Sequence, residues 1–178
     1  MKVIKKILPI ALCLIFAFSL VACDKGGSGN DGGDTTVKGE TIDTGKFSAI
    51  CPEGWVNSPV KDLFSDEDVI SDTQLQFFKA DKLEDSTMFT ADQVNIYYYD
   101  ANTIYIDARD FYDNTEDFSI EVDGLTWLGY TGESFGYPIL VLTNPTETFQ
   151  VVFTFTAGDM DANSPDVKAI VGGLRVTE

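Results

Sequence analysis

The chain carries three cysteines, twenty-nine acidic residues and no histidine. Thiols and carboxylates are therefore the side chains with which it could do chemistry. The lack of histidine excludes the Ser-His-Asp and Cys-His arrangements of nucleophilic hydrolases, and it excludes histidine ligation of zinc. Carboxylate oxygens leave two classes open, which are binding of a hard cation and hydrolysis by a pair of carboxylates.

Cys23 follows a segment with three distinct parts. Residues 1–6 contain three lysines and no acid, residues 7–20 are mostly apolar, and Val21 and Ala22 precede the cysteine. A basic start, a short apolar middle and small residues at the exit are typical of a secretory signal peptide. The apolar run is shorter than the roughly 20 residues that a membrane-spanning helix needs. We therefore expect residues 1–22 to be a signal peptide.

The run Leu20-Val21-Ala22-Cys23 resembles the lipobox of bacterial lipoproteins. The resemblance implies that the Cys23 sulfur is diacylated and that the chain is cut before Cys23. Two or more acyl chains give stable membrane anchoring, whereas one gives only marginal binding. The resemblance also implies a place on the outer face of the plasma membrane. In cells with two membranes, an aspartate directly after the lipidated cysteine tends to keep such lipoproteins at that membrane, and Asp24 has this position. An ordinary signal peptide with an incidental cysteine is the alternative.

The segment after the lipobox is rich in glycine and aspartate, and Val37 is its only apolar residue. Such a composition buries too little surface to compensate for the entropy lost on ordering. We expect residues 23–40 to be a flexible linker, with a root-mean-square span of roughly 20–25 Å.

The mature chain is strongly acidic. Removing residues 1–22 takes away three lysines and no acid, which leaves 9 basic against 29 acidic residues and a formal charge of −20. A surface of this sign is a poor ligand for nucleic acid, and anionic lipid repels it beyond the lipid anchor itself. Cys51 is then the only free thiol, so no internal disulfide is expected. We interpret Cys51 as a small buried residue at a strand end.

No cofactor and no metal site are predicted. Asp159, Asp161 and Asn163 alternate like the start of a calcium loop, but Ser164 and Ile170 stand where that loop needs glycine and glutamate. A polar loop that leads into a capped helix is the simpler interpretation.

Most of the remaining chain alternates between apolar and polar residues, the pattern of half-buried strands. Val94, Ile96 and Tyr98 alternate in this way, and Asp123-Gly124 is a two-residue hairpin signal. In that hairpin we expect Phe118, Ile120, Val122, Leu125 and Trp127 to share the core face, with Ile120 opposite Trp127. A second hairpin is expected to turn at residues 144–147.

Two helices are expected. Ile104, Ala108, Phe111 and Tyr112 share one face of a helix over residues 104–115, which places Asp107, Asp110 and Asp113 on the opposite face. The second helix follows Ser164, a good N-cap, with Pro165 at its first position.

The stretches GKFSAICPEGW and SPDVKAIVGGLRV, together with a middle helix and antiparallel strands, resemble the PsbP-like fold. The resemblance covers residues 41–178 and implies a single α+β domain, an antiparallel sheet flanked by a few helices. It implies no functional residue at any position. One fold hosts many functions, so it bears on fold and setting only.

The candidate binding surface combines tyrosines with aspartates. Because Val94, Ile96 and Tyr98 are expected in the core, Tyr97 and Tyr99 point to the other side of the sheet. Together with Asp107, Asp110 and Asp113 they would form an aromatic patch rimmed by negative charge, suited to a cationic or polyhydroxylated ligand or a basic protein. The alternatives are a covering layer of helices and, for the aspartates, a solvated face.

No residue is identified as catalytic, since no catalytic motif is present. The sequence therefore favours a membrane-anchored extracytoplasmic lipoprotein that acts as a non-catalytic binding or accessory module, with an envelope protein among its possible partners. A small envelope hydrolase that uses a carboxylate pair is the alternative function.

Overall fold

The computed structural model describes residues 38–62, 69–101, 103, 105–158 and 160–177. The expected signal peptide, Cys23, nearly all of the expected linker and the acidic run at 66–68 lie outside the described residues. Within the described part of the chain, no helix is long and apolar enough to cross a membrane.

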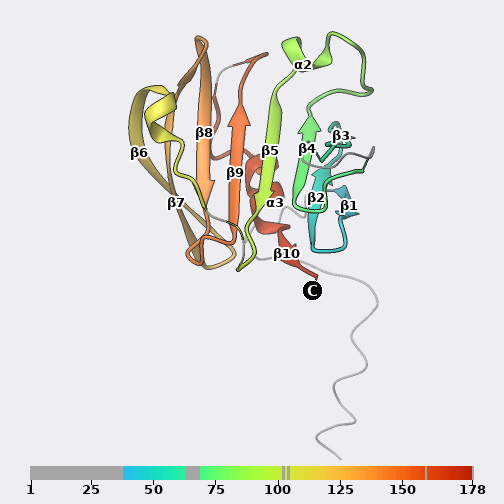
Figure 1. The fold of residues 1–178 in the computed structure, drawn as a ribbon. Helices are drawn as coiled ribbons and strands as arrows, with labels where there is room; N and C mark the ends of the chain where they lie inside the picture. The colour runs from blue at the N-terminus through green and yellow to red at the C-terminus, as the bar shows by residue number, and fades with distance from the viewer. Residues whose placement is uncertain (1–37, 63–68, 102, 104, 159, 178) are drawn as a thin grey trace, which may run out of the picture. The chain divides into compact units, whose positions relative to one another are not determined.

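A seven-stranded sheet, here called the large sheet, has the order β3-β4-β5-β9-β8-β7-β6, and all neighbouring strands are antiparallel (Figure 1). Sequential hairpins connect β6 through β9, so these four strands form a meander. The bounds are β3 (Val56–Ser58), β4 (Gln74–Phe78), β5 (Gln93–Tyr98), β6 (Asp113–Val122), β7 (Leu125–Ser134), β8 (Tyr137–Thr143) and β9 (Phe149–Thr154).

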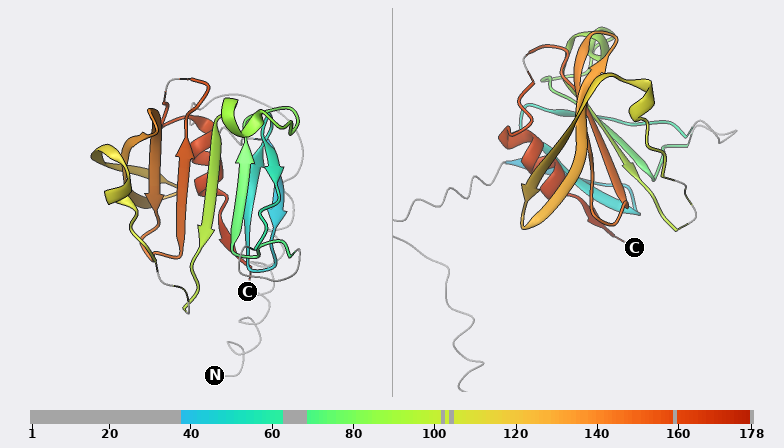
Figure 2. Two further views of the ribbon diagram at one scale, coloured as in Figure 1. Left: turned by 45° about the horizontal axis from the view of Figure 1, so that its top comes forward. Right: turned by 90° about the vertical axis from the view of Figure 1, so that its left-hand side faces the viewer.

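A second sheet of three strands has the order β1-β2-β10, with β1 (Gly39–Asp43), β2 (Phe47–Pro52) and β10 (Arg175–Val176). The helical elements are α2 (Thr87–Thr90), the 3-10 turn η2 (Arg109–Phe111) and α3 (Pro165–Gly172). Figure 1 and the right-hand view of Figure 2 place α3 on one side of the large sheet and η2 on the other. The described chain is therefore predominantly β with few helices, which confirms the expected antiparallel sheet and agrees with an α+β class only in the broad sense.

The main core lies between the large sheet, the small sheet and α3. Val94, Ile96 and Tyr98 of β5 belong to it, as predicted from their alternation. Aromatic and aliphatic side chains of the two sheets and the helix fill the rest; they include Phe47, Leu75, Phe77, Leu140, Leu142, Phe149, Val151, Phe153, Val167 and Ile170. Each such side chain contributes about 1.5–3 kcal/mol through burial, so this one interface holds the two sheets and α3 together.

The predicted hairpin at Asp123-Gly124 is confirmed. Val122 pairs with Leu125 and Ile120 with Trp127, and φ is +52° at Asp123 and +76° at Gly124, the left-handed pair that a tight hairpin requires. Leu125 lies on the same face as Val122 and Trp127, as predicted, but its side chain is 54% exposed because it stands at the end of the ladder.

The terminal helix α3 begins as predicted. The backbone N–H of Val167 donates to Ser164 Oγ at 3.2 Å, and Pro165 occupies the first turn, where no N–H partner is needed. Val167, Ile170 and Val171 form its buried stripe against the core.

The helix predicted over residues 104–115 is wrong. Residues 105–108 form no regular element, Arg109–Phe111 make the single turn η2, and β6 already begins at Asp113. The proposed apolar stripe is not buried as a unit, since Phe111 is 83% exposed while Tyr112 packs against a small cluster around Tyr130. Aspartate, asparagine, threonine and aromatic residues dominate this range and have weak helix propensity. Pairing with β7 therefore determines the conformation from Asp113 onward.

Strand β6 is an edge strand of ten residues, with β7 as its only sheet neighbour in the described chain. Its six exposed positions all carry polar or acidic side chains, and four of these are the acids Asp113, Glu116, Asp117 and Glu121.

The turn between β7 and β8 holds a strained aromatic residue. Phe135 has φ of +53° and is 99% exposed, and Gly136 follows with φ of +82°. This conformation is unfavourable for a bulky residue, whereas asparagine adopts it readily.

We predict that Phe135→Asn raises the free energy of unfolding by about 1 kcal/mol, because it relieves the strain without removing a packed side chain. Denaturant unfolding measures the change. Asp123→Asn is the matched control, since Asp123 has the same backbone conformation and already tolerates it, and it should change stability by less than about 0.5 kcal/mol. Equal effects of the two substitutions would contradict the prediction.

Candidate functional site

The side of the large sheet that faces away from α3 carries five tyrosines, which we call the tyrosine face: Tyr97, Tyr99, Tyr105, Tyr112 and Tyr130. Alternation along β5 positions the first two, because Ile96 and Tyr98 point into the main core. Tyr130 packs there with Ile139 and Val141 of β8 in a second, smaller cluster. The large sheet thus has an apolar side that faces the main core and an outer side that carries tyrosines and amides.

The segment 105–112 runs across the tyrosine face (Figure 2, right). The rings of Tyr99 and Tyr105 meet edge to face with centroids 5.5 Å apart, and those of Tyr112 and Tyr130 are 6.1 Å apart. The hydroxyl of Tyr105 also shares a hydrogen bond of 3.2 Å with Thr143 Oγ1 on β8. These contacts hold an irregular segment against the sheet without a helix.

A buried amide fixes the centre of this arrangement. Gln150 of β9 is 5% exposed. Tyr99 Oη donates to Gln150 Oε1 at 3.3 Å, and Gln150 Nε2 donates to Tyr105 Oη at 3.3 Å and to the carbonyl of Ile106 at 3.5 Å. Leaving a buried amide without partners costs about 1–3 kcal/mol, so Gln150 sets the positions of both tyrosines.

Arg109 of η2 lies over Tyr130, with the guanidinium carbon 4.6 Å from the ring centroid. Arg109 Nη2 donates to Asp117 Oδ1 at 2.6 Å, and the Arg109 backbone N–H donates to Asp107 Oδ1 at 3.0 Å. A cation over a tyrosine ring is attracted by about 0.5–2 kcal/mol. The turn η2 is therefore held in place from both its backbone and its side chain.

A pocket of about 380 Å³, which we call the tyrosine pocket, opens beside this stack. Its wall is formed by the segment 105–109, by β7 and by the β8–β9 turn. Its lining includes Tyr105, Asp107, Arg109, Leu128, Tyr130 and Glu147. The volume lies within the roughly 300–1,000 Å³ that is usual for small-molecule sites.

The predicted surface residues are brought together only in part. Tyr97 and Tyr99 are half-buried, and among the described residues no helix covers them. Asp107 lines the tyrosine pocket, whereas Asp110 and Asp113 are exposed and are not among its lining residues. The expectation that the three aspartates share one helix face is wrong, because that helix is absent.

Sequence reasoning missed Tyr105, Arg109, Tyr130 and Gln150. Arg109 is one of only two arginines in the chain and stands among aspartates, which was a usable signal. Gln150 could have been noticed as a polar position between the core residues Phe149 and Val151 of a strand.

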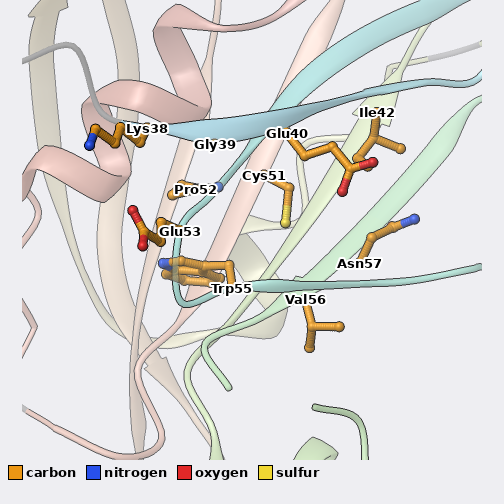
Figure 3. Close-up of a pocket in the computed structure, with 10 residues that line it drawn as sticks. All are labelled: Lys38, Gly39, Glu40, Ile42, Cys51, Pro52, Glu53, Trp55, Val56 and Asn57. Atoms are coloured by element: carbon orange, nitrogen blue, oxygen red, sulfur yellow. The ribbon is translucent and has the colours of Figure 1, made fainter. Parts of the chain in front are cut away.

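A second pocket, of about 410 Å³, lies beside β1, β2 and the turn that carries Trp55 (Figure 3). Cys51 lines it and pairs across the ladder with Glu40. Burial, reinforced by the Glu40 carboxylate, raises the pKa of the Cys51 thiol to about 11. The thiol is thus protonated at neutral pH and is a poor nucleophile. Cys51 is buried near the end of β2, as predicted.

The two tryptophans have structural contacts. Trp127 is 4% exposed in the main core. Trp55 is half-buried; its Nε1–H donates to Asp166 Oδ2 at 3.0 Å, and Lys79 Nζ lies 5.8 Å from its ring centroid. Within the described residues, no three acidic or thiol side chains converge as metal ligands would.

No protein-family model and no curated protein matches the chain. Among solved structures, the chain is similar to a solution structure of the cyanobacterial PsbP protein CyanoP from Synechocystis sp. PCC 6803. The two are 13% identical, the match covers 84% of this chain and 98% of that one, and the TM-score is 0.35. A likeness of this degree assigns no function, so the site is argued from this chain's own geometry.

The tyrosine face makes stability dependent on pH at the alkaline end. Burial raises the pKa of Tyr99 to about 12, and burial also raises the pKa values of Tyr97, Tyr112 and Tyr130 above their ordinary value. In the unfolded chain tyrosine ionises near pH 10. Because the folded state favours the neutral phenols, their contribution is complete below about pH 10 and is lost as pH rises toward 12.

We predict that the unfolding midpoint falls between about pH 10 and 12 and that Tyr130→Phe flattens this fall, because the variant removes one ionisable phenol. Thermal unfolding at several pH values measures the slope. Tyr137→Phe is the control, since Tyr137 is 43% exposed, and it should leave the slope unchanged. A slope that Tyr130→Phe does not alter would contradict this assignment.

Proposed function

We propose that the protein is a lipid-anchored extracytoplasmic binding or accessory module and that its ligand contacts the tyrosine face. The sequence up to Cys23 supports the anchoring, through its resemblance to a lipobox. The proposed partners are the membrane, through the anchor, and a component of the cell envelope.

One observation carries the binding proposal. The large sheet presents aromatic hydroxyls and amides on the side away from its core, and a pocket opens there. Tyrosine gives contact area at low entropic cost and is enriched where proteins bind partners. A side that served only to be solvated would need neither five tyrosines nor a fixing amide such as Gln150.

A carboxylate-pair hydrolase is the second candidate function. The observation in its favour is that Asp107 and Glu147 line the same pocket. Glycoside hydrolysis uses two carboxyl groups about 5–10 Å apart, one of which acts as acid and the other as base or nucleophile.

Lipid attachment is tested at Cys23. We predict that Cys23→Ser moves the protein from the membrane fraction to the soluble fraction and removes the mass of the acyl chains, because Cys23 is the cysteine of the lipobox-like run. Cell fractionation and intact-mass spectrometry measure both effects. Cys51→Ser is the matched control and should leave both unchanged. A Cys23→Ser protein that stays membrane-bound at unchanged mass would contradict the anchoring.

Binding at the tyrosine face is tested by photo-crosslinking in intact cells. We predict that a photoreactive phenylalanine analogue at Ile106, which is 62% exposed between Tyr105 and Asp107, captures a component of the envelope. The same analogue at Val176, which is 47% exposed on β10, is the control. Capture at Val176 but not at Ile106 would argue against the tyrosine face.

Activity assays beside the crosslinking distinguish a binding module from a hydrolase. Turnover of envelope polymers that is lost in both Asp107→Asn and Glu147→Gln would establish the hydrolase and overturn the non-catalytic proposal. Capture at Ile106 without turnover supports the binding module.

A further inference from the structure

Two buried polar atoms of the tyrosine pocket have no hydrogen-bond partner among the described residues: Tyr130 Oη and Arg109 Nε. The Tyr130 side chain is only 3% exposed. Nearly all buried polar groups in native proteins are hydrogen-bonded, and each one left without a partner costs about 1–3 kcal/mol. Two such atoms on stacked side chains indicate a binding site for a molecule that supplies the missing hydrogen bonds.

The two atoms define what that partner must offer. Arg109 Nε–H can only donate, while Tyr130 Oη can donate or accept. The guanidinium lies over the Tyr130 ring, so both groups lie on the same side of β7. A ligand oxygen that accepts from Nε–H and also exchanges a hydrogen bond with the phenol satisfies both.

The charges and the hydrogen-bond donors of the pocket together favour an uncharged partner. Arg109 is already paired with Asp117, and the other charged lining groups used here are the carboxylates of Asp107 and Glu147. A negative pocket repels an anion, and a cation offers no acceptor to the Arg109 Nε–H donor, which would stay unpaired. A hydroxyl group fits both conditions, because it accepts from Nε–H and donates to a carboxylate.

The pocket also has an apolar side. Tyr105 is half-buried, and Leu128 of β7 is 61% exposed. A ring with hydroxyls at its edge and C–H groups on its faces can pack against these residues while its hydroxyls reach Arg109 and Tyr130. Carbohydrates have this combination.

We infer that the tyrosine pocket binds an uncharged glycan through one sugar ring, with a ring hydroxyl between Arg109 Nε and Tyr130 Oη. The inference rests on the proposed binding function and names its ligand class. Both atoms are shielded in the free protein, so the Arg109 side chain must rotate on binding. That rotation is inexpensive, because Arg109 is 38% and Asp117 is 89% exposed and such exposed ion pairs contribute only about 0–1 kcal/mol.

Nuclear magnetic resonance gives a direct test, because the chain has two arginines and hence two arginine Nε–H signals. The full chain carrying Cys23→Ser is titrated with chitohexaose, cellohexaose and maltohexaose. Inorganic phosphate and spermidine are the anionic and cationic comparisons. We expect at least one hexasaccharide to shift the Arg109 Nε–H signal and to leave the Arg175 signal in place.

Tyr130→Phe then removes the phenol oxygen and keeps the ring. We expect it to raise the dissociation constant of the bound hexasaccharide about tenfold, or about 1.4 kcal/mol, without lowering the unfolding midpoint. Tyr137→Phe is the matched control and should leave the dissociation constant unchanged. An unchanged affinity in Tyr130→Phe overturns the inference.

Two further outcomes also overturn the glycan inference. One is that no hexasaccharide shifts the Arg109 Nε–H signal up to about 10 mM, a concentration that detects even millimolar affinities. The other is that only phosphate or spermidine shifts it. If crosslinking at Ile106 succeeds while all glycans fail, the binding function stands and only the ligand class is wrong. If both fail, the binding function is wrong as well.

Discussion

The two-sided nature of the large sheet is the constraint on which the rest of the structure depends. Side chains alternate along each strand, so seven strands create two faces that must both be accommodated. The described chain has one substantial helix, α3, and one small sheet, and both lie on the side of the main core. The opposite side is left to a single irregular segment. It can be stable only if its side chains tolerate partial contact with water, and tyrosine does so because its ring packs while its hydroxyl stays hydrogen-bonded.

The polar interactions of that side follow from the same constraint. An irregular segment cannot satisfy its own backbone groups as a helix does. The carbonyl of Ile106 therefore takes a hydrogen bond from Gln150, and the turn η2 is tied down through Arg109. Tyr130 shows the limit of this arrangement. Its side chain is buried, but its hydroxyl has no hydrogen-bond partner among the described residues.

Much of the fold could be predicted from the sequence because local rules determine it. The alternation at Val94, Ile96 and Tyr98, the Asp123-Gly124 turn and the Ser164 cap each depend on a few neighbouring residues, and the structure confirms them. Residues 104–115 were predicted wrongly because tertiary pairing with β7 overrides a weak local preference. The candidate site was predicted in part. Alternation alone brings Tyr97 and Tyr99 to the outer side, but the meeting of Arg109 with Tyr130 depends on the path of an irregular segment, which no periodicity encodes.

The acidic edge strand β6 has a consequence for crowding. An exposed strand edge offers free backbone groups to a second copy of the chain. Two copies of β6 that approach in antiparallel register would bring Asp113, Glu116, Asp117 and Glu121 of one strand against the acids of the other. Like charges directly opposite each other destabilise a strand pair. The acidity of β6 thus opposes the joining of two copies into a continuous sheet.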